Sequence, residues 1–127
     1  MYKVEQATAA DMAQITEFIK KIDSNSCPEI SILMRAILVK DEGRVVGMVS
    51  YESHNSMGVI RYFLYDHCLA GTDLIVLMFF ELYKNARQAG IKRLVATVSN
   101  DEVKALFAML GFAGDEDNKS SMVIQLD

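Results

Sequence analysis

The sequence predicts a mixed α/β domain in which a mainly antiparallel sheet carries helices on both faces. Three observations support this prediction. Segments with the composition of strands recur along the chain, segments with apolar residues at helical spacing lie between them, and the second half alternates between strand and helix. The chain has 127 residues, of which 51% are hydrophobic and 24% charged, so a single domain over residues 1–127 with one core is expected.

The first elements are predicted from a short strand and a capping signal. Residues 2–6 suit a strand, and Thr8 with Asp11 resembles a capping box that starts a helix. The apolar face of that helix is expected at Met12, Ile15, Ile19 and Ile22. Pro28 suits the first turn of a short second helix.

Three strands are predicted in the middle of the chain. Residues 37–40 are apolar and β-branched, and a turn with Gly43 leads into a returning strand at residues 45–52. After a polar loop at residues 53–56, residues 57–65 are rich in strand-forming side chains. The first two of these strands are expected to form a hairpin.

The second half is predicted to alternate helix and strand. A long helix at residues 71–89 ends at Gly90, and a buried strand at residues 93–98 follows. A helix at residues 101–110 and a final strand at residues 121–126 complete the order β-α-α-β-β-β-α-β-α-β.

The segment between that helix and the final strand is acidic and polar. Residues 114–120 are expected to form a mobile loop, and a further short strand after Gly111 is left open.

Composition narrows the class of function. The net charge of −4 argues against nucleic acid as the main partner, because phosphate binding needs a basic surface. The two cysteines, Cys27 and Cys68, give neither a disulfide framework nor a metal-ligand spacing, so no metal is expected. The longest apolar run is far shorter than the about 20 residues of a membrane span, and no secretory signal precedes the domain. A soluble, cytoplasmic protein is therefore expected.

Two local patterns carry a resemblance to a known family. The helix that ends in Ala86-Arg87-Gln88-Ala89-Gly90 leads into a strand, and Asn100 after that strand is followed by Phe107 and by Gly111-Phe112 at matching spacings. With the order of elements, these patterns resemble the GNAT superfamily of N-acetyltransferases over nearly the whole chain.

The resemblance implies transfer of an acetyl group from acetyl-CoA to an amine of a small molecule or a protein. It places the pyrophosphate on the N-terminus of the long helix, where free N–H groups and the helix dipole favour an anion. A backbone N–H near Leu64 and Tyr65 would polarise the thioester carbonyl. The cofactor-binding residues implied in this way are Leu64, Tyr65, Gly71, Thr72, Asn100 and Phe107.

The phosphate-binding motif of that family is changed in this chain. Ala70 stands at its basic or amide position, and Asp73 and Ile75 stand at its two glycine or small-residue positions. Phe107 replaces the tyrosine that often protonates the leaving thiolate. These changes support a second hypothesis, a degenerate GNAT-fold binding or regulatory module that has lost both CoA binding and catalysis.

Three side chains are candidates for the base that deprotonates the amine. Asp66 and His67 follow the strand at residues 57–65, and Glu52 lies on the strand before it. A histidine titrates in the range that such a base needs. The alternative is that Asp66 and His67 form a solvated connection between the strand and the long helix.

The long helix is apolar on two sides. Val76, Phe80 and Tyr83 form a stripe that points away from the residues expected to face the sheet. Either the C-terminal segment of the chain covers this stripe or a second molecule does, and a homodimer is the first form of that second alternative.

Overall fold

A computed structural model describes residues 1–126 of the chain. It divides into two units, one made of residues 1–51 and 61–82 and the other of residues 52–60 and 83 onward. Strands β3 (Arg44–His54) and β4 (Met57–Tyr65) and helix α3 (Asp73–Gln88) contribute residues to both units, and the two units are described in turn.

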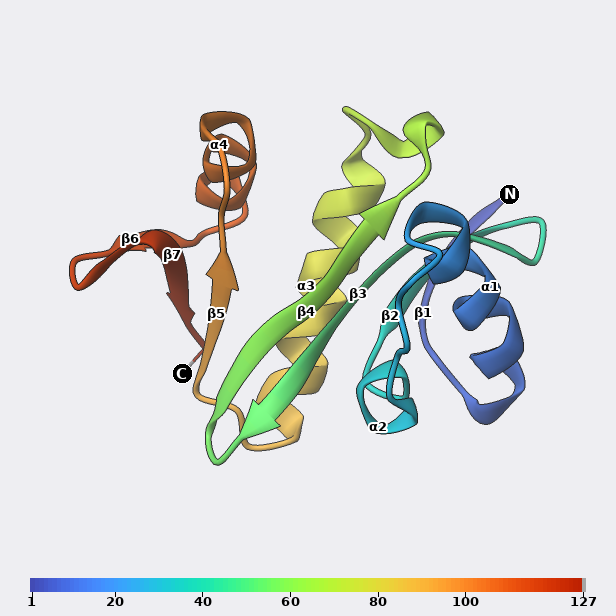
Figure 1. Cartoon of the computed structure of the whole chain (residues 1–127), viewed down its shortest axis with the longest axis horizontal. Coiled ribbons are helices and arrows are strands. Elements are labelled where there is room, and N and C mark those ends of the chain that lie inside the picture. Colours follow the sequence, from blue (N-terminus) through green and yellow to red (C-terminus); the bar gives the residue numbers. More distant parts are fainter. Residues whose placement is uncertain (127) are drawn as a thin grey trace. The chain divides into compact units, whose positions relative to one another are not determined.

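The order of elements agrees with the prediction at almost every position (Figure 1). The strands form one sheet in the order β1-β2-β3-β4-β5-β7-β6. The remaining elements are β1 (Tyr2–Gln6), η1 (Ala9–Asp11), α1 (Met12–Ile22), α2 (Ile30–Leu33), β2 (Ile37–Asp41), η2 (His67–Leu69), β5 (Arg93–Thr97), α4 (Asp101–Met109), β6 (Ala113–Asp115) and β7 (Asn118–Gln125).

One prediction about the C-terminal part is wrong. Residues 114–120, expected as a loop, contain the end of β6 and the start of β7, which pair with each other. The strand left open after Gly111 exists as β6. β7 also pairs antiparallel with β5, where Ser121 lies opposite Thr97, and β6 pairs with β7. Such pairing between separate segments leaves no local sequence signal.

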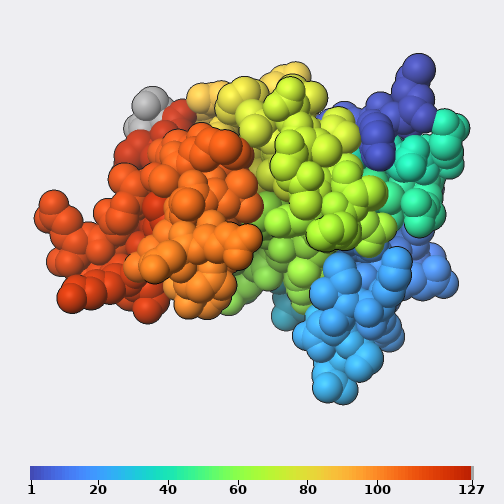
Figure 2. Space-filling model, turned by 90° about the horizontal axis from the view of Figure 1, so that it is seen from above, coloured from blue at the N-terminus to red at the C-terminus, as the bar shows by residue number. Residues whose placement is uncertain are grey.

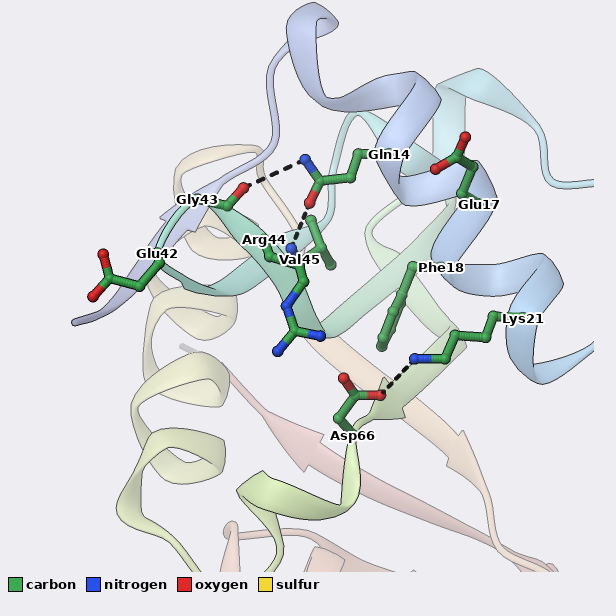
Figure 3. A pocket seen from close by; sticks show the side chains of 9 residues that line it. All are labelled: Gln14, Glu17, Phe18, Lys21, Glu42, Gly43, Arg44, Val45 and Asp66. Carbon is green, nitrogen blue, oxygen red and sulfur yellow. Dashed lines mark hydrogen bonds and ion pairs between the residues drawn. The ribbon is translucent and has the colours of Figure 1, made fainter.

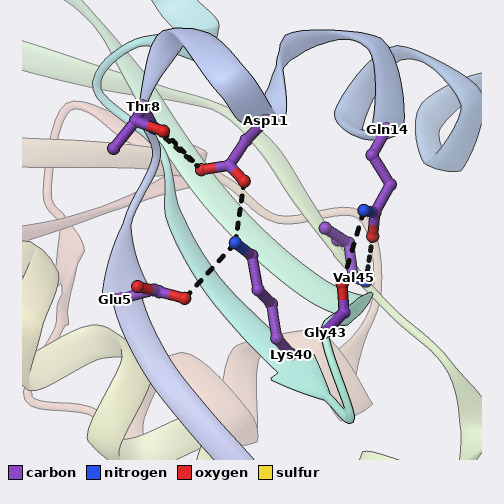
Figure 4. A network of polar contacts seen from close by, with 7 residues as sticks. All are labelled: Glu5, Thr8, Asp11, Gln14, Lys40, Gly43 and Val45. Atoms are coloured by element: carbon purple, nitrogen blue, oxygen red, sulfur yellow. Dashed lines mark hydrogen bonds and ion pairs between the residues drawn. The ribbon is translucent and has the colours of Figure 1, made fainter.

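In the first unit, the entry to α1 is fixed by the predicted capping pair. The carboxylate of Asp11 accepts hydrogen bonds from the Thr8 N–H at 2.9 Å and from the Thr8 hydroxyl at 3.2 Å (Figure 4). Its other oxygen lies 2.7 Å from the ammonium of Lys40 on β2, and Lys40 also pairs with Glu5 on β1 at 3.3 Å. This polar network ties β1, the start of α1 and β2 together.

Helices cover both faces of the sheet in the first unit, as predicted. Tyr62 and Leu64 of β4 pack against a core cluster that includes Ile15 and Ile19 of α1. Phe63 lies between them in sequence and makes an edge-to-face contact with Phe79 of α3, with ring centroids 5.0 Å apart. Since successive strand residues point to opposite faces, α1 and α3 pack on opposite sides of β4.

The start of β1 lies beside the turn between β2 and β3, as Figure 2 shows in dark blue and teal. The register pairs Tyr2 with Asp41, and the N–H of Glu42 donates to the Met1 carbonyl at 3.3 Å. On α1, Phe18 is buried with Ile15 and Ile19, whereas Ile22, predicted on the same face, is 48% exposed.

The second unit is built around β5. Residues 57–59 of β4 pair with it in parallel on one side, and β7 pairs with it antiparallel on the other. Phe107 of α4 is 3% exposed and meets Phe112 edge to face, with ring centroids 5.0 Å apart.

The predicted stripe on α3 is covered at one of its three residues. Tyr83 is 7% exposed, and its hydroxyl donates to the Leu110 carbonyl at 2.7 Å, so the C-terminal segment covers it. Phe80 is 56% exposed and Val76 is half-buried. Leu77, which was not predicted in this stripe, is 48% exposed.

Candidate functional site

The segment that joins β4 to α3 carries most of the predicted site residues. β4 ends at Tyr65, and the N–H of Asp66 donates to the Val46 carbonyl on β3 at 2.7 Å. A single 3-10 turn, η2, follows. Its last residue, Leu69, is fully buried and its side chain approaches Gly47 so closely that a Cβ added there would lie 2.8 Å from it. The glycine on β3 therefore lets this segment lie flat against the sheet.

Several N–H groups of this segment bond within the segment itself. The N–H of Leu69 donates to Asp66 at 2.9 Å and that of Ala70 to His67 at 3.0 Å. The N–H of Thr72 donates to the Leu69 carbonyl at 3.1 Å, and the Thr72 hydroxyl donates to the same oxygen at 2.7 Å. These donors are satisfied, so an anion in this position could use them only after the turn rearranged.

The first turn of α3 presents a carboxylate at its positive end. Asp73 is exposed and begins the helix, where the helix dipole stabilises a negative charge. Ile75 is 4% exposed, so its bulk lies in the interior. Gly71 has a φ of +73°, a conformation that glycine adopts readily.

The side chains of the last β4 residues are packed on opposite faces. Leu64 is half-buried against the core cluster that contains α1. The Tyr65 ring lies 5.4 Å from the Phe63 ring, on the face that α3 covers. Packing on both faces fixes the course of this backbone, whose N–H groups are predicted to face the thioester carbonyl.

The candidate bases occupy different surroundings. Asp66 faces α1, where its carboxylate lies 3.8 Å from the ammonium of Lys21. The side chain of Asp66 is 22% exposed. His67 follows it and is exposed. Glu52 belongs to the second unit, where its carboxylate lies 3.5 Å from Nε2 of His54, two residues along β3.

Asn100 and Phe107, also in the second unit, have structural roles of their own. Asn100 caps α4, because its side-chain oxygen accepts a hydrogen bond from the Val103 N–H at 2.9 Å. Phe107 is buried against Phe112. Their assignment to a cofactor remains a prediction.

A cavity of about 310 Å³ in the first unit was not predicted from the sequence. Asp66 lies at its edge, with Lys21 of α1 and Arg44 of the β2–β3 hairpin (Figure 3). Its residues come from three separate segments of the chain, and no local motif marks such an arrangement.

Residues 1–126 lack two kinds of feature. No group of three or more His, Cys, Asp and Glu side chains among these residues is arranged to hold a metal ion. Helices long and apolar enough to cross a bilayer are likewise absent from this part of the chain.

No protein-family model and no curated protein matches the chain. Solved structures match all of it. An acetyltransferase of the GNAT family from Streptococcus pneumoniae has a TM-score of 0.78 at 13% identity, with 100% of both chains covered. The chain has the fold of the GNAT N-acetyltransferases.

Two further solved structures match this chain over different shares of their own length. The ribosomal-protein-S18-alanine N-acetyltransferase of Escherichia coli matches with a TM-score of 0.70 at 14% identity, covering 100% of this chain and 95% of that one. N-acetylglutamate synthase from Neisseria gonorrhoeae matches with a TM-score of 0.79 at 17% identity. The chain spans about a third of that synthase, since 35% of the longer protein is covered.

On this GNAT fold, the predicted site residues divide between the two units. Leu64, Tyr65, Gly71 and Thr72 are near one another in the first unit, with Asp66 and His67 between them. The second unit holds the rest, namely Glu52, Asn100 and Phe107.

Proposed function

We propose that the protein is an N-acetyltransferase that moves an acetyl group from acetyl-CoA to an amine of a small molecule or a protein. The observation that carries the proposal is the match of the whole chain to GNAT-fold enzymes, with a strand, a turn and a long helix in the expected order. Two of the matching structures, the Neisseria gonorrhoeae synthase and the PaiA acetyltransferase of Thermoplasma acidophilum, are complexes with coenzyme A. Because one fold can serve many functions, the evidence for this activity must also come from the residues of the site.

The backbone at the end of β4 is the part of the chain assigned to the acyl donor. An N–H near Leu64 and Tyr65 would donate to the thioester carbonyl and stabilise the negative charge that develops on its oxygen. The rigid packing of this backbone supports that role, because a fixed donor needs no reorganisation during the reaction.

The amine must lose a proton before it attacks. A C–N bond then forms, the C–S bond breaks, and the CoA thiolate takes up a proton. We assign the base to His67, because its side chain is exposed and an imidazole nitrogen can accept the proton of the amine. Asp66 and Glu52 remain alternatives, although each carboxylate already has a partner. The partner of Asp66 is Lys21, and that of Glu52 is His54. Phe107 cannot protonate the thiolate, so water would do so.

A test of this proposal is the release of free CoA from acetyl-CoA in the presence of a panel of amines. We expect the wild type to release CoA with at least one amine. His67→Ala should lower kcat/KM by about 100-fold, the lower end of the range for a general base. Glu29→Ala, on the exposed residue before α2, serves as a control and should match the wild type. An unchanged rate in His67→Ala would remove this histidine from the mechanism.

A second function is favoured by the turn before α3. The internal hydrogen bonds of Leu69, Ala70 and Thr72, with the carboxylate of Asp73, oppose a pyrophosphate in that position. They support a binding or regulatory module that has kept the fold and lost the acyl donor. Absence of CoA release with every amine, together with absence of acetyl-CoA binding, would favour this function over the first.

A further inference from the structure

The cavity beside Asp66 combines an apolar floor with charged walls. Phe18 of α1 and Val45 of β3 form the floor, and they are only 6% and 4% exposed. α1 forms one wall and the β2–β3 hairpin the other (Figure 3). All lining residues belong to the first unit.

A side chain from α1 holds the two walls in place. The amide of Gln14 accepts a hydrogen bond from the Val45 N–H at 2.5 Å and donates to the Gly43 carbonyl at 3.4 Å. Both bonds are drawn in Figure 3. Because they clamp the hairpin to the helix, the cavity is formed before any ligand arrives, which lowers the entropic cost of binding.

Charged side chains of both signs line the two walls. Arg44 reaches from the hairpin toward Asp66 and Lys21, as Figure 3 shows. Within residues 1–126, neither Arg44 nor Glu17 of α1 makes a side-chain hydrogen bond or an ion pair. Lys21 and Asp66 are 3.8 Å apart, a loose pair that leaves hydrogen-bonding capacity on both groups.

The volume limits the size of a ligand. A cavity of about 310 Å³ is at the lower end of the range for small-molecule sites, roughly 300 to 1,000 Å³. It is too small to bury a molecule as large as coenzyme A. Its charges of both signs over an apolar floor favour a small molecule that carries both charges and a short apolar part.

We propose that this cavity binds a small zwitterion of the α-amino-acid class. Its carboxylate would pair with Arg44, whose guanidinium can donate two parallel hydrogen bonds to a carboxylate. Its ammonium would pair with Glu17 and Asp66, and its side chain would lie on Phe18. Asp66 also belongs to the segment that joins β4 to α3, but binding at this site does not depend on acetyl transfer.

The test uses the full chain without acyl-CoA. The L-amino acids are screened individually by thermal shift, and the best is titrated by calorimetry. Its amine analogue without the carboxylate and its α-keto acid without the ammonium are titrated in parallel. The two variants Arg44→Gln and Glu17→Gln each remove one charge, while Lys20→Gln and Glu29→Gln remove matched exposed charges outside the cavity.

We expect one or more L-amino acids to bind in the cavity. Each cavity variant should weaken that affinity by about tenfold or more, and each control should change it by less than about twofold. Both single-charge analogues should bind at least about tenfold more weakly than the zwitterion. The proposal is overturned if no amino acid binds at about 10 mM, which is about ten times a Kd of 1 mM. Equal binding of the analogues, or unchanged affinity in Arg44→Gln and Glu17→Gln, would also overturn it.

Discussion

Replacement of Asp11 by asparagine should destabilise the protein by about 2 to 3 kcal/mol at pH 7. Removing one partner of a buried ion pair usually costs about 3 to 5 kcal/mol, because the other charge remains buried without compensation. Asp11 is 8% exposed, and the ammonium of Lys40 lies 2.7 Å from its carboxylate. We take a smaller value because Lys40 keeps Glu5 at 3.3 Å, and Glu5 is half in solvent.

The loss should depend on pH in a defined direction. The hydrogen bond from Lys40 is the main cause that holds the pKa of Asp11 below its ordinary value of 3.8, and the Thr8 N–H acts in the same sense. A lowered pKa in the folded state means that the stabilisation is present above the unfolded value and is lost as pH falls through the folded value. The asparagine variant lacks this titration, so its stability should approach that of the wild type in acid.

Urea denaturation of wild type and Asp11→Asn from pH 7 down to about pH 2.5 measures this difference. The exposed Asp117→Asn is the matched control and should remain within about 0.5 kcal/mol of the wild type. A loss below about 0.5 kcal/mol at pH 7, or a loss of constant size at every pH, would refute the role given to the Asp11–Lys40 pair.

Three further substitutions test the packing around the candidate site and the second unit by denaturation. Gly47→Ala should lower the free energy of unfolding by about 1 to 3 kcal/mol, because the added Cβ would lie 2.8 Å from the buried side chain of Leu69. An unchanged stability would mean that the Leu69 side chain moves aside without cost. Tyr83→Phe should lower the free energy of unfolding by about 1 to 2 kcal/mol, because it leaves the Leu110 carbonyl without the hydroxyl that donates to it at 2.7 Å. Burial raises the pKa of Tyr83, so the hydroxyl keeps its proton and this loss should be constant from pH 6 to about pH 9. Asn100→Ala should cost about 1 kcal/mol through loss of a helix cap, and Asn100→Asp should retain most of that stability.

Local signals predicted most of the fold. Thr8 and Asp11 are three residues apart, and the Asp11 carboxylate accepts hydrogen bonds from the Thr8 N–H and hydroxyl at the start of a helix. These bonds join near neighbours in the sequence, so the sequence alone predicts them. β6 and the start of β7 were missed because their pairing, not their composition, makes them strands.

The site was harder to predict than the fold. Asp66 and His67 became candidates because they follow a predicted strand, and their role stays a prediction. The ion-pair partner of Asp66 is Lys21, which is far away in sequence. The same holds for the cavity, which combines α1 with the β2–β3 hairpin. Contacts of this kind come from tertiary packing, and one sequence gives no signal for them.

Binding of the acyl donor is tested by a calorimetric titration of acetyl-CoA into wild type and Asp73→Gly. At about 5 Å and an effective dielectric of about 20, two like unit charges repel by about 3 kcal/mol, and salt reduces this. We expect the wild type to bind acetyl-CoA weakly and Asp73→Gly to bind it at least about tenfold more tightly at low salt. Asp101→Gly, at the first turn of α4, is the matched control and should leave the affinity unchanged. No binding to either protein at about 1 mM acetyl-CoA would contradict the acetyltransferase proposal and favour the module.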